Sequence, residues 1–288
     1  MRTEQEIFQL ALDVAQKDER IRAVALNGSR ADPAAPPDTL QDYDIVYLVR
    51  DMDSFLANHS WVDVFGERII LQMPEAGSLP CYPPANEGWF TYLMLFCDGN
   101  RIDLALWPVQ DAESYKQQEP YTRVLLDKDG LLAALPPPDP QRFWVKRPGQ
   151  KVFADCCNEF WWVSAYVAKG LWRGQLLYAT YHMEQVIAPM LHMMLEWRAA
   201  APHNFAVDTG KNGMYLDRYL PGDVWERYIA TKNLAGYPAC RAALWGCVEL
   251  FRESALWVAA ELGLAYNQTE DERMTGWLHG LLDGLELE

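Results

Sequence analysis

Two apolar runs joined by a polar break constrain the fold of this chain more than any other stretch. The first run, 23–26, is typical of a buried strand and ends at Asn27-Gly28-Ser29-Arg30. The second run follows a proline-rich loop and carries two acids, Asp42 and Asp44. Because the side chains of a strand alternate between its two faces, both acids are predicted to share one face. That face should also hold Val46 and Leu48, and the opposite face should hold Tyr43, Ile45 and Tyr47.

The two acids predict a magnesium site. Neighbouring carboxylates repel each other and resist burial unless a cation or a proton joins them. Mg²⁺ prefers one or two carboxylates together with phosphate oxygens, so we expect Asp42 and Asp44 to be its ligands. Gly28 would let the backbone approach a phosphate, to which Ser29 and Arg30 could donate hydrogen bonds. The alternative is an edge strand whose outer face merely carries acids.

A third acid lies in a later predicted strand. The apolar runs 91–97 and 101–107 flank Asp98-Gly99-Asn100, and an Asp-Gly between such runs is a strong hairpin signal. Asp103 falls in the middle of the second run, where an acid is costly unless it is functional or paired. Arg101 is predicted to share its face. A structural ion pair between the two therefore remains the alternative to a catalytic role.

The composition along the chain predicts two domains. The 288 residues are 50% hydrophobic, which is enough for a sizeable core. Thr3 and Glu6 form a capping-box pattern that predicts a helix over 4–17. A proline-rich linker is expected over 136–149. We therefore expect an α/β domain with a mixed sheet over 1–135 and an all-α helical domain over 150–288. The helices predicted in the second domain span 153–171, 176–198, 238–262 and 271–285.

The net charge and the cysteine pattern limit which partners and metal sites are expected. The formal net charge of −15 argues against a nucleic acid as the main partner and is compatible with a cationic one, although simple solubility would also explain it. The six Cys form no Cys-x-x-Cys pair, and the five His lack zinc-site spacing. The first 20 residues are too acidic for a signal peptide, and no apolar stretch reaches about 18 residues. A cytoplasmic protein without a membrane span is expected, and the sequence leaves its oligomeric state open.

The three acids and the Gly-Ser turn resemble the signature of the nucleotidyltransferase superfamily. That signature combines Gly28-Ser29, the acid-x-acid pair Asp42 and Asp44, and the distant third acid Asp103. The wider sequence resembles one branch, the aminoglycoside 6-adenylyltransferases that inactivate streptomycin. The matching stretches cover both predicted domains: LNGSRADPAAP, QDYDIVYLV, DGNRIDL, DCCNEFWWVSAYVAKGLWR and GKNGMYLDRYLP.

The resemblance implies Mg²⁺-dependent transfer of AMP from ATP to the 6-hydroxyl of streptomycin, with release of pyrophosphate. Asp42 and Asp44 would hold the metal. Asp103 would take the proton of the sugar hydroxyl, or would complete the metal site. Gly28, Ser29 and Arg30 would hold the triphosphate. A nucleotidyltransferase for another small-molecule or protein hydroxyl, and a non-catalytic nucleotide-binding relative, remain alternatives; the three intact acids argue against the latter.

Four residues of the helical domain are further candidates. Lys169 and Lys211 could reach the phosphates, and the Gly-Lys-Asn-Gly loop around Lys211 suits an anion. Both lysines could equally be solvated surface residues. Glu159 and Trp162 are expected to face the aminoglycoside. Because neighbouring residues of a helix point about 100° apart, at least one of Trp161 and Trp162 should belong to the core.

Overall fold

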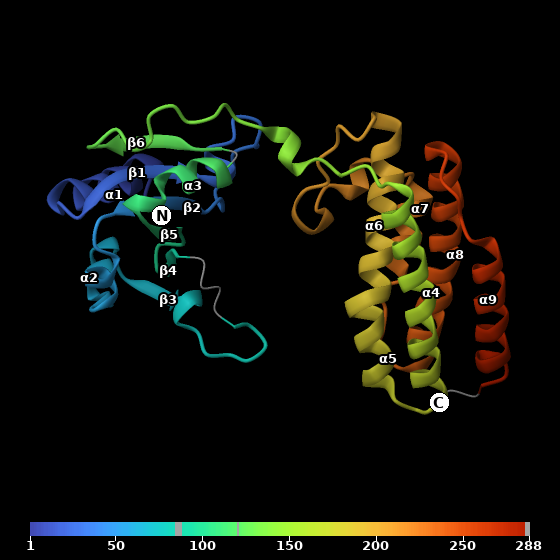
Figure 1. The fold of residues 1–288 in the computed structure, drawn as a ribbon. Helices are drawn as coiled ribbons and strands as arrows, with labels where there is room; N and C mark the ends of the chain where they lie inside the picture. The colour runs from blue at the N-terminus through green and yellow to red at the C-terminus, as the bar shows by residue number, and fades with distance from the viewer. Residues whose placement is uncertain (84–87, 120, 286–288) are drawn as a thin grey trace. The chain divides into compact units, whose positions relative to one another are not determined.

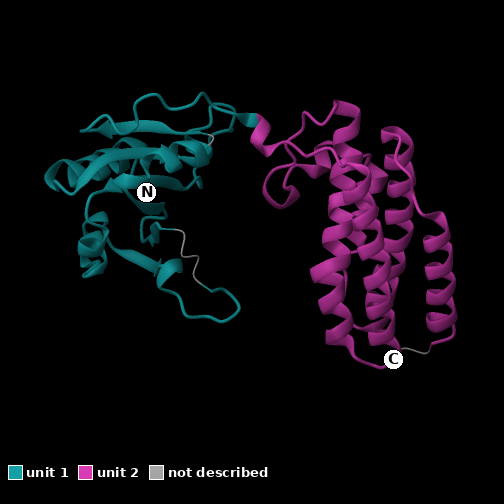
Figure 2. Ribbon diagram, in the orientation of Figure 1, with its two compact units in different colours: residues 1–140 teal, residues 141–288 magenta. Residues whose placement is uncertain are grey.

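The chain forms two compact units, Met1–Pro140 and Gln141–Glu288 (Figure 2). The computed structural model describes residues 1–83, 88–119 and 121–285. The first unit combines a mixed sheet with helices, and the second is helical (Figure 1). The predicted fold class, α/β followed by all-α, is therefore confirmed. The boundary between the units lies within the proline-rich segment 136–149.

A six-stranded sheet forms the centre of the first unit, with the strand order β3-β4-β5-β2-β1-β6. Among the described strands, β2 and β5 alone run parallel to each other, and the other neighbouring pairs are antiparallel. The strands are β1 (Ile21–Asn27), β2 (Tyr43–Val49), β3 (Arg68–Gln72), β4 (Phe90–Phe96), β5 (Arg101–Pro108) and β6 (Arg123–Asp127). The parallel pair lies in the middle of the sheet and brings together segments about 60 residues apart in the chain.

The two faces of the sheet carry different cores. One face packs against α1 (Glu4–Lys17) and α2 (Met52–Leu56) in a large cluster that includes Tyr43, Ile45 and Tyr47. The other face packs against α3 (Ala112–Gln118) in a smaller cluster that includes Val46 and Leu48. The predicted alternation along β2 is therefore confirmed. The smaller cluster covers only part of its face, and the catalytic candidates lie beside it.

The first unit also contains elements that the sequence did not predict. These are α3, the edge strand β6 and a 3₁₀ segment, His59–Phe65. Each is short or lies partly exposed at an edge, so neither a helical nor an alternating apolar pattern develops in it. The capping box of α1 is present: the Thr3 side chain accepts from the Glu6 backbone, and the Glu6 side chain accepts from the Thr3 backbone.

The second unit packs its helices around one core. The predicted helix over 176–198 is interrupted by a π-helical turn, Met183–Ile187, shortly before Pro189. Proline cannot donate the backbone hydrogen bond of an α-helix, and a π-turn is one way to absorb that loss. The helices are α4 (Gln150–Trp172), α5 (Leu176–His182), α6 (Ala188–Ala200), α7 (Gly222–Ala230), α8 (Tyr237–Leu262) and α9 (Gln268–Leu282). Within the described ranges, no helix is both long and apolar enough to cross a bilayer.

Candidate active site

Strand pairing brings the three predicted acids together. In the parallel β2–β5 ladder Asp44 is the register partner of Asp103, and in the antiparallel β1–β2 ladder it pairs with Asn27. Asp42 lies just before β2. Register partners on neighbouring strands point to the same face of a sheet. The acid-x-acid pair and the third acid therefore meet on the face that carries the smaller core.

Gly28 lies directly against the Asp44 carboxylate. The chain leaves β1 through a 3₁₀ turn, Gly28–Arg30, with Gly28 at φ +67°. A Cβ atom built on Gly28 would lie 2.0 Å from Asp44 Oδ2. Glycine is therefore needed here for two reasons, since the backbone is left-handed and the carboxylate leaves no room for a side chain.

Arg101 joins two of the acids. Its Nε donates to Asp103 Oδ1 at 2.8 Å and its Nη2 to Asp103 Oδ2 at 2.7 Å, while its Nη1 lies 3.3 Å from Asp42 Oδ2. The predicted ion pair is thus present. The Arg101 side chain is 44% exposed, so the pair adds little to stability. An ionised carboxylate has about four acceptor sites, so Asp103 can accept a further hydrogen bond while Arg101 orients it.

Asp44 carries most of the electrostatic cost of the site. Burial, followed by the charges of Asp103, Asp42 and Glu119, raises the pKa of Asp44 from its ordinary value of 3.8 to about 6. Burial also raises the pKa of Asp42, and Arg101 partly opposes that shift. A proton or a cation would relieve this cost.

The donor set fits Mg²⁺ as sequence reasoning expects. Among the described residues, no group of three or more His, Cys, Asp or Glu side chains is arranged to hold a metal by itself. Mg²⁺ does not need such a cage, because it usually combines one or two carboxylates with phosphate oxygens and water. Asp42 and Asp44 supply hard oxygen donors at a place where burial, and then the neighbouring carboxylates, raise the pKa of Asp44.

Ser29 and Arg30 hold the loop that follows β1. The Arg30 guanidinium lies 3.8 Å from the centre of the Tyr43 ring and donates to the carbonyl oxygens of Gln41 and Asp42. It also lies 3.0 Å from a Glu4 carboxylate oxygen. These contacts anchor the start of β2. The proposed roles of both residues in nucleotide binding stay predictions.

A cavity of about 320 Å³ opens beside the carboxylates. Sequence reasoning missed Trp89, Trp107 and Glu119 in its wall. The alternation along β5 could have indicated Trp107, which shares the face of Asp103; Trp89 and Glu119 lie outside the strands and gave no signal. The cavity is lined by Asn27, Gly28, Asp44, Ile45, Val46, Trp89, Thr91, Leu93, Asp103, Ala105, Trp107, Gln118 and Glu119.

The remaining candidates lie in the second unit. Trp161 is buried and Trp162 is 62% exposed, as the 100° spacing required. Lys211 is exposed in its glycine loop, and Lys169 lies 5.8 Å from the centre of the Trp277 ring. Glu159 is exposed. The roles of Lys169, Lys211, Glu159 and Trp162 stay predictions.

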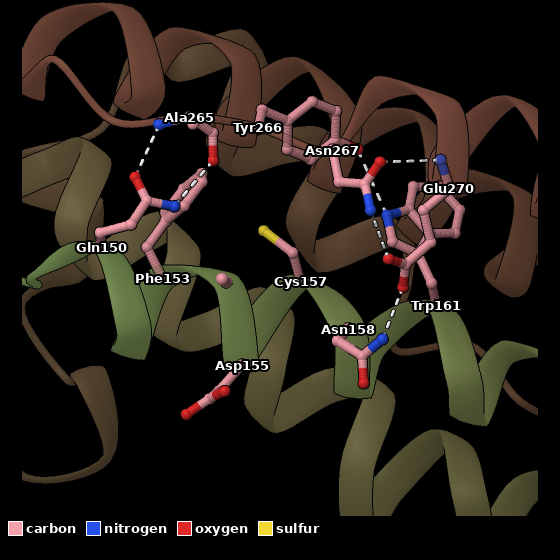
Figure 3. Close-up of a pocket in the computed structure, with 11 residues that line it drawn as sticks. Gln150, Phe153, Asp155, Cys157, Asn158, Trp161, Ala265, Tyr266, Asn267 and Glu270 are labelled. Carbon is pink, nitrogen blue, oxygen red and sulfur yellow. Dashed lines mark hydrogen bonds between the residues drawn. The ribbon is translucent and has the colours of Figure 1, made fainter.

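The helical unit also has a cavity of its own, of about 340 Å³, between α4 and the segment before α9 (Figure 3). Hydrogen bonds join its walls. Gln150 exchanges two hydrogen bonds with the Ala265 backbone, at 2.7 and 2.9 Å, and Asn158 donates to Glu270 at 2.6 Å. Figure 3 shows Cys157 rising from α4 into the space between these pairs. Neither Glu159 nor Trp162 lines this cavity.

Known proteins resemble the chain over nearly its whole length. The model of the family described as streptomycin adenylyltransferase matches residues 1–281. An aminoglycoside 6-adenylyltransferase from Bacillus subtilis (strain 168) is 41% identical over 283 residues, 98% of either chain. One from Campylobacter jejuni is 39% identical over 96% of this chain and 95% of that one. A crystal structure of an aminoglycoside 6-adenyltransferase from Bacillus subtilis is 38% identical over 99% of this chain and 100% of that one, with a TM-score of 0.49. The chain therefore belongs to the streptomycin adenylyltransferase family, a family of nucleotidyltransferases.

Proposed function

We propose that this protein transfers AMP from ATP to the 6-hydroxyl of streptomycin and releases pyrophosphate. The observation that carries the proposal is the meeting of Asp44 and Asp103 as register partners on two parallel strands, with Asp42 just before β2 and Gly28 against Asp44. The streptomycin adenylyltransferase family and the relatives named aminoglycoside 6-adenylyltransferase support this choice of substrate class.

The residues of the site can carry this chemistry. The acceptor hydroxyl attacks the α-phosphorus of ATP, and pyrophosphate leaves on the opposite side. Asp103, held in orientation by Arg101, accepts the proton of the attacking hydroxyl. Gly28 lets the backbone approach the triphosphate, and the exposed Ser29 hydroxyl can donate to it. Mg²⁺ bound to Asp42 and Asp44 would neutralise charge on the phosphate oxygens.

A nucleotidyltransferase for another hydroxyl is the second candidate. The three carboxylates suit any hydroxyl acceptor, so they do not choose among acceptors. They do argue against a non-catalytic relative, because Asp44 is buried and held beside two like charges, at a cost that its raised pKa reflects.

Mass spectrometry tests the proposal directly. Incubation with ATP, Mg²⁺ and streptomycin should yield a product heavier by one adenylyl group, together with pyrophosphate. Kanamycin and spectinomycin should be poor acceptors, because neither contains the streptidine ring of streptomycin. A mass shift on one of those or on lincomycin, with none on streptomycin, would overturn the substrate and leave the nucleotidyltransferase assignment intact.

The variant Asp103→Asn tests the role of the base. Turnover should fall by at least about 10²-fold, because general-base help typically contributes that much, while the affinity for ATP stays nearly unchanged. Steady-state kinetics and calorimetry of ATP binding measure both quantities. If ATP·Mg²⁺ binding falls as far as turnover does, Asp103 acts mainly as a metal ligand.

A further inference from the structure

We propose that the cavity between Asp103 and Trp89 is the acceptor pocket, and that Trp89 and Ala105 set its specificity. The pocket would take the cationic ring that carries the attacking hydroxyl, with one face of that ring against Trp89. This inference rests on the proposed function. It moves acceptor recognition from Glu159 and Trp162 in the helical unit to the sheet itself.

Charge decides which substrate the cavity suits. Of its lining residues in the described part of the chain, Asp44, Asp103 and Glu119 are carboxylates and none is Lys or Arg. Arg101 offsets part of this charge through Asp103 without lining the cavity. Two of the lining residues, Gly28 and Asp44, are also the proposed partners of the Mg²⁺·triphosphate. The other two lining carboxylates, Asp103 and Glu119, would attract an ammonium or guanidinium group. The part of the cavity between Asp103, Glu119 and Trp89 therefore suits a cationic acceptor.

Trp89 is held in place by a row of stacked and edge-packed rings. Its ring stacks on Trp107 with 4.7 Å between centroids and 15° between planes, and Trp107 packs edge-on against Tyr115 at 5.4 Å. Trp107 and Tyr115 are both buried. The Tyr115 hydroxyl donates to Asn27 Oδ1 at 2.7 Å, and Asn27 is the register partner of Asp44. The orientation of Trp89 is thus tied to β5, which carries Asp103, and through Asn27 on β1 to the register partner of Asp44.

A tryptophan face suits the proposed ligand. Cations bind over tryptophan rings with about 0.5–2 kcal/mol of favourable energy, depending on how far they are desolvated. Trp89 is partly exposed and lines the cavity, while Trp107 behind it is only 7% exposed. Trp89 is therefore the ring of the pair that a ligand can reach.

Ala105 makes the room. It lies on β5 between Asp103 and Trp107, on the same face, and its register partner is Val46. At about 3.3 Å per residue, the two flanking residues are about 13 Å apart along the strand, and only a methyl group fills the floor between them. A cavity of about 320 Å³ is at the small end for ligand sites. It suits one substituted six-membered ring, so the rest of a larger aminoglycoside would lie outside.

Two variants test the pocket by different means. Trp89→Ala removes the stacking face. Ala105→Leu fills the floor of the cavity and leaves every lining carboxylate in the sequence. For each, calorimetry without ATP should show streptomycin binding at least about 10-fold more weakly, while the KM for ATP stays within about two-fold. Trp89→Phe, which retains an aromatic face, should lose less affinity for streptomycin than Trp89→Ala does. Trp172→Ala is the matched control, since Trp172 is 57% exposed in the helical unit and belongs to no proposed site. Thermal unfolding confirms that each variant is folded.

The outcomes separate this inference from the proposed function. If the wild type adenylylates streptomycin but neither variant weakens its binding, the acceptor pocket lies elsewhere and the proposed function stands. If the variants raise the KM for ATP and leave streptomycin binding intact, the cavity holds the nucleotide base instead. If the wild type adenylylates another aminoglycoside, streptomycin is wrong as the substrate; the pocket stands if Trp89→Ala and Ala105→Leu weaken binding of that acceptor, and it is overturned if they do not. If the wild type neither adenylylates nor binds any aminoglycoside, both the acceptor pocket and the proposed function are overturned.

Discussion

Asp44 is the residue on which the electrostatics of the site concentrate. The folded state raises its pKa to about 6 from 3.8, so folding favours its protonated form. The stability that this contributes is fully present below about pH 4 and is lost as the pH rises through about 6. Above that pH the ionised Asp44 carboxylate lowers the free energy of unfolding by up to about 3 kcal/mol, at about 1.4 kcal/mol per pKa unit.

Replacing Asp44 should therefore stabilise the metal-free protein while it abolishes catalysis. At pH 7.5 in chelator, Asp44→Asn should raise the melting temperature, because no charge is left to bury. The difference should vanish near pH 4, where Asp44 of the wild type is largely protonated. Thermal unfolding at both values measures this, and activity should be almost absent. A loss of stability at pH 7.5 would show that the carboxylate has a structural role.

Gly28 and Gly130 separate backbone strain from contact with the Asp44 carboxylate. Both have positive φ, +67° and +72°, but only Gly28 faces a neighbour within 4 Å. Gly130→Ala should cost about 1 kcal/mol for the left-handed backbone alone and leave turnover unchanged. Gly28→Ala should cost more and lower turnover at least about 10²-fold, because the new methyl displaces Asp44. Melting temperatures and turnover numbers of the two variants test this. If both variants lose the same stability and the same turnover, the contact between Gly28 and Asp44 is unimportant.

At the scale of elements, α9 is fastened to α8 through a buried acid. Asp271 is 2% exposed, and its carboxylate receives hydrogen bonds from Arg252, Tyr266 and Thr275. The Arg252 interaction is bidentate, at 2.6 and 2.7 Å. An acid buried this deeply would suggest a functional site by its type alone. Its partners instead give it a structural role.

Removing that carboxylate should destabilise the protein strongly. Asp271→Ala removes the carboxylate that Arg252 pairs with and leaves Thr275 as its hydrogen-bond partner. Because Arg252 is half-buried, we expect a loss of about 3 kcal/mol, the lower end for a broken buried pair. Asp155→Ala is the control, because its pair with Lys151 on α4 is exposed at both ends and should contribute less than about 1 kcal/mol. Denaturant unfolding compares the two. Similar small losses in both would mean that α9 is held by its apolar contacts alone.

The whole molecule carries a net charge of −15. Such a field attracts a polycationic acceptor over distances longer than a contact, and salt screens it. We expect kcat/KM for streptomycin to fall as the salt concentration rises from about 50 to about 300 mM, where the screening length drops below about 10 Å. Steady-state kinetics at constant pH measure this. A salt-independent kcat/KM would show that steering by the net charge is negligible.

Much of this architecture could be predicted because it depends on local pattern. The alternation of 43–49 indicated which side chains of β2 share a face, and Asp98-Gly99 indicated the hairpin between β4 and β5. The capping residues placed the start of α1. Periodicity also indicated the long helices of the second unit, with ends within a few residues of those observed. All these signals lie within a few residues of the element they specify.

Tertiary structure alone decided what lies next to what. The sequence contained Asp44, Asp103 and Gly28, but the register of the β2–β5 ladder and the close approach of Gly28 make them one site. Trp89 and Glu119 joined its wall from outside the strands, where no periodicity marks a residue. Asp103 is ion-paired with Arg101 and also lies opposite Asp44, so the ion pair does not keep it away from the other acids, and its catalytic role stays a prediction. A pattern specifies which way a side chain faces along its own strand, whereas its neighbours are set by pairing between segments far apart in the chain.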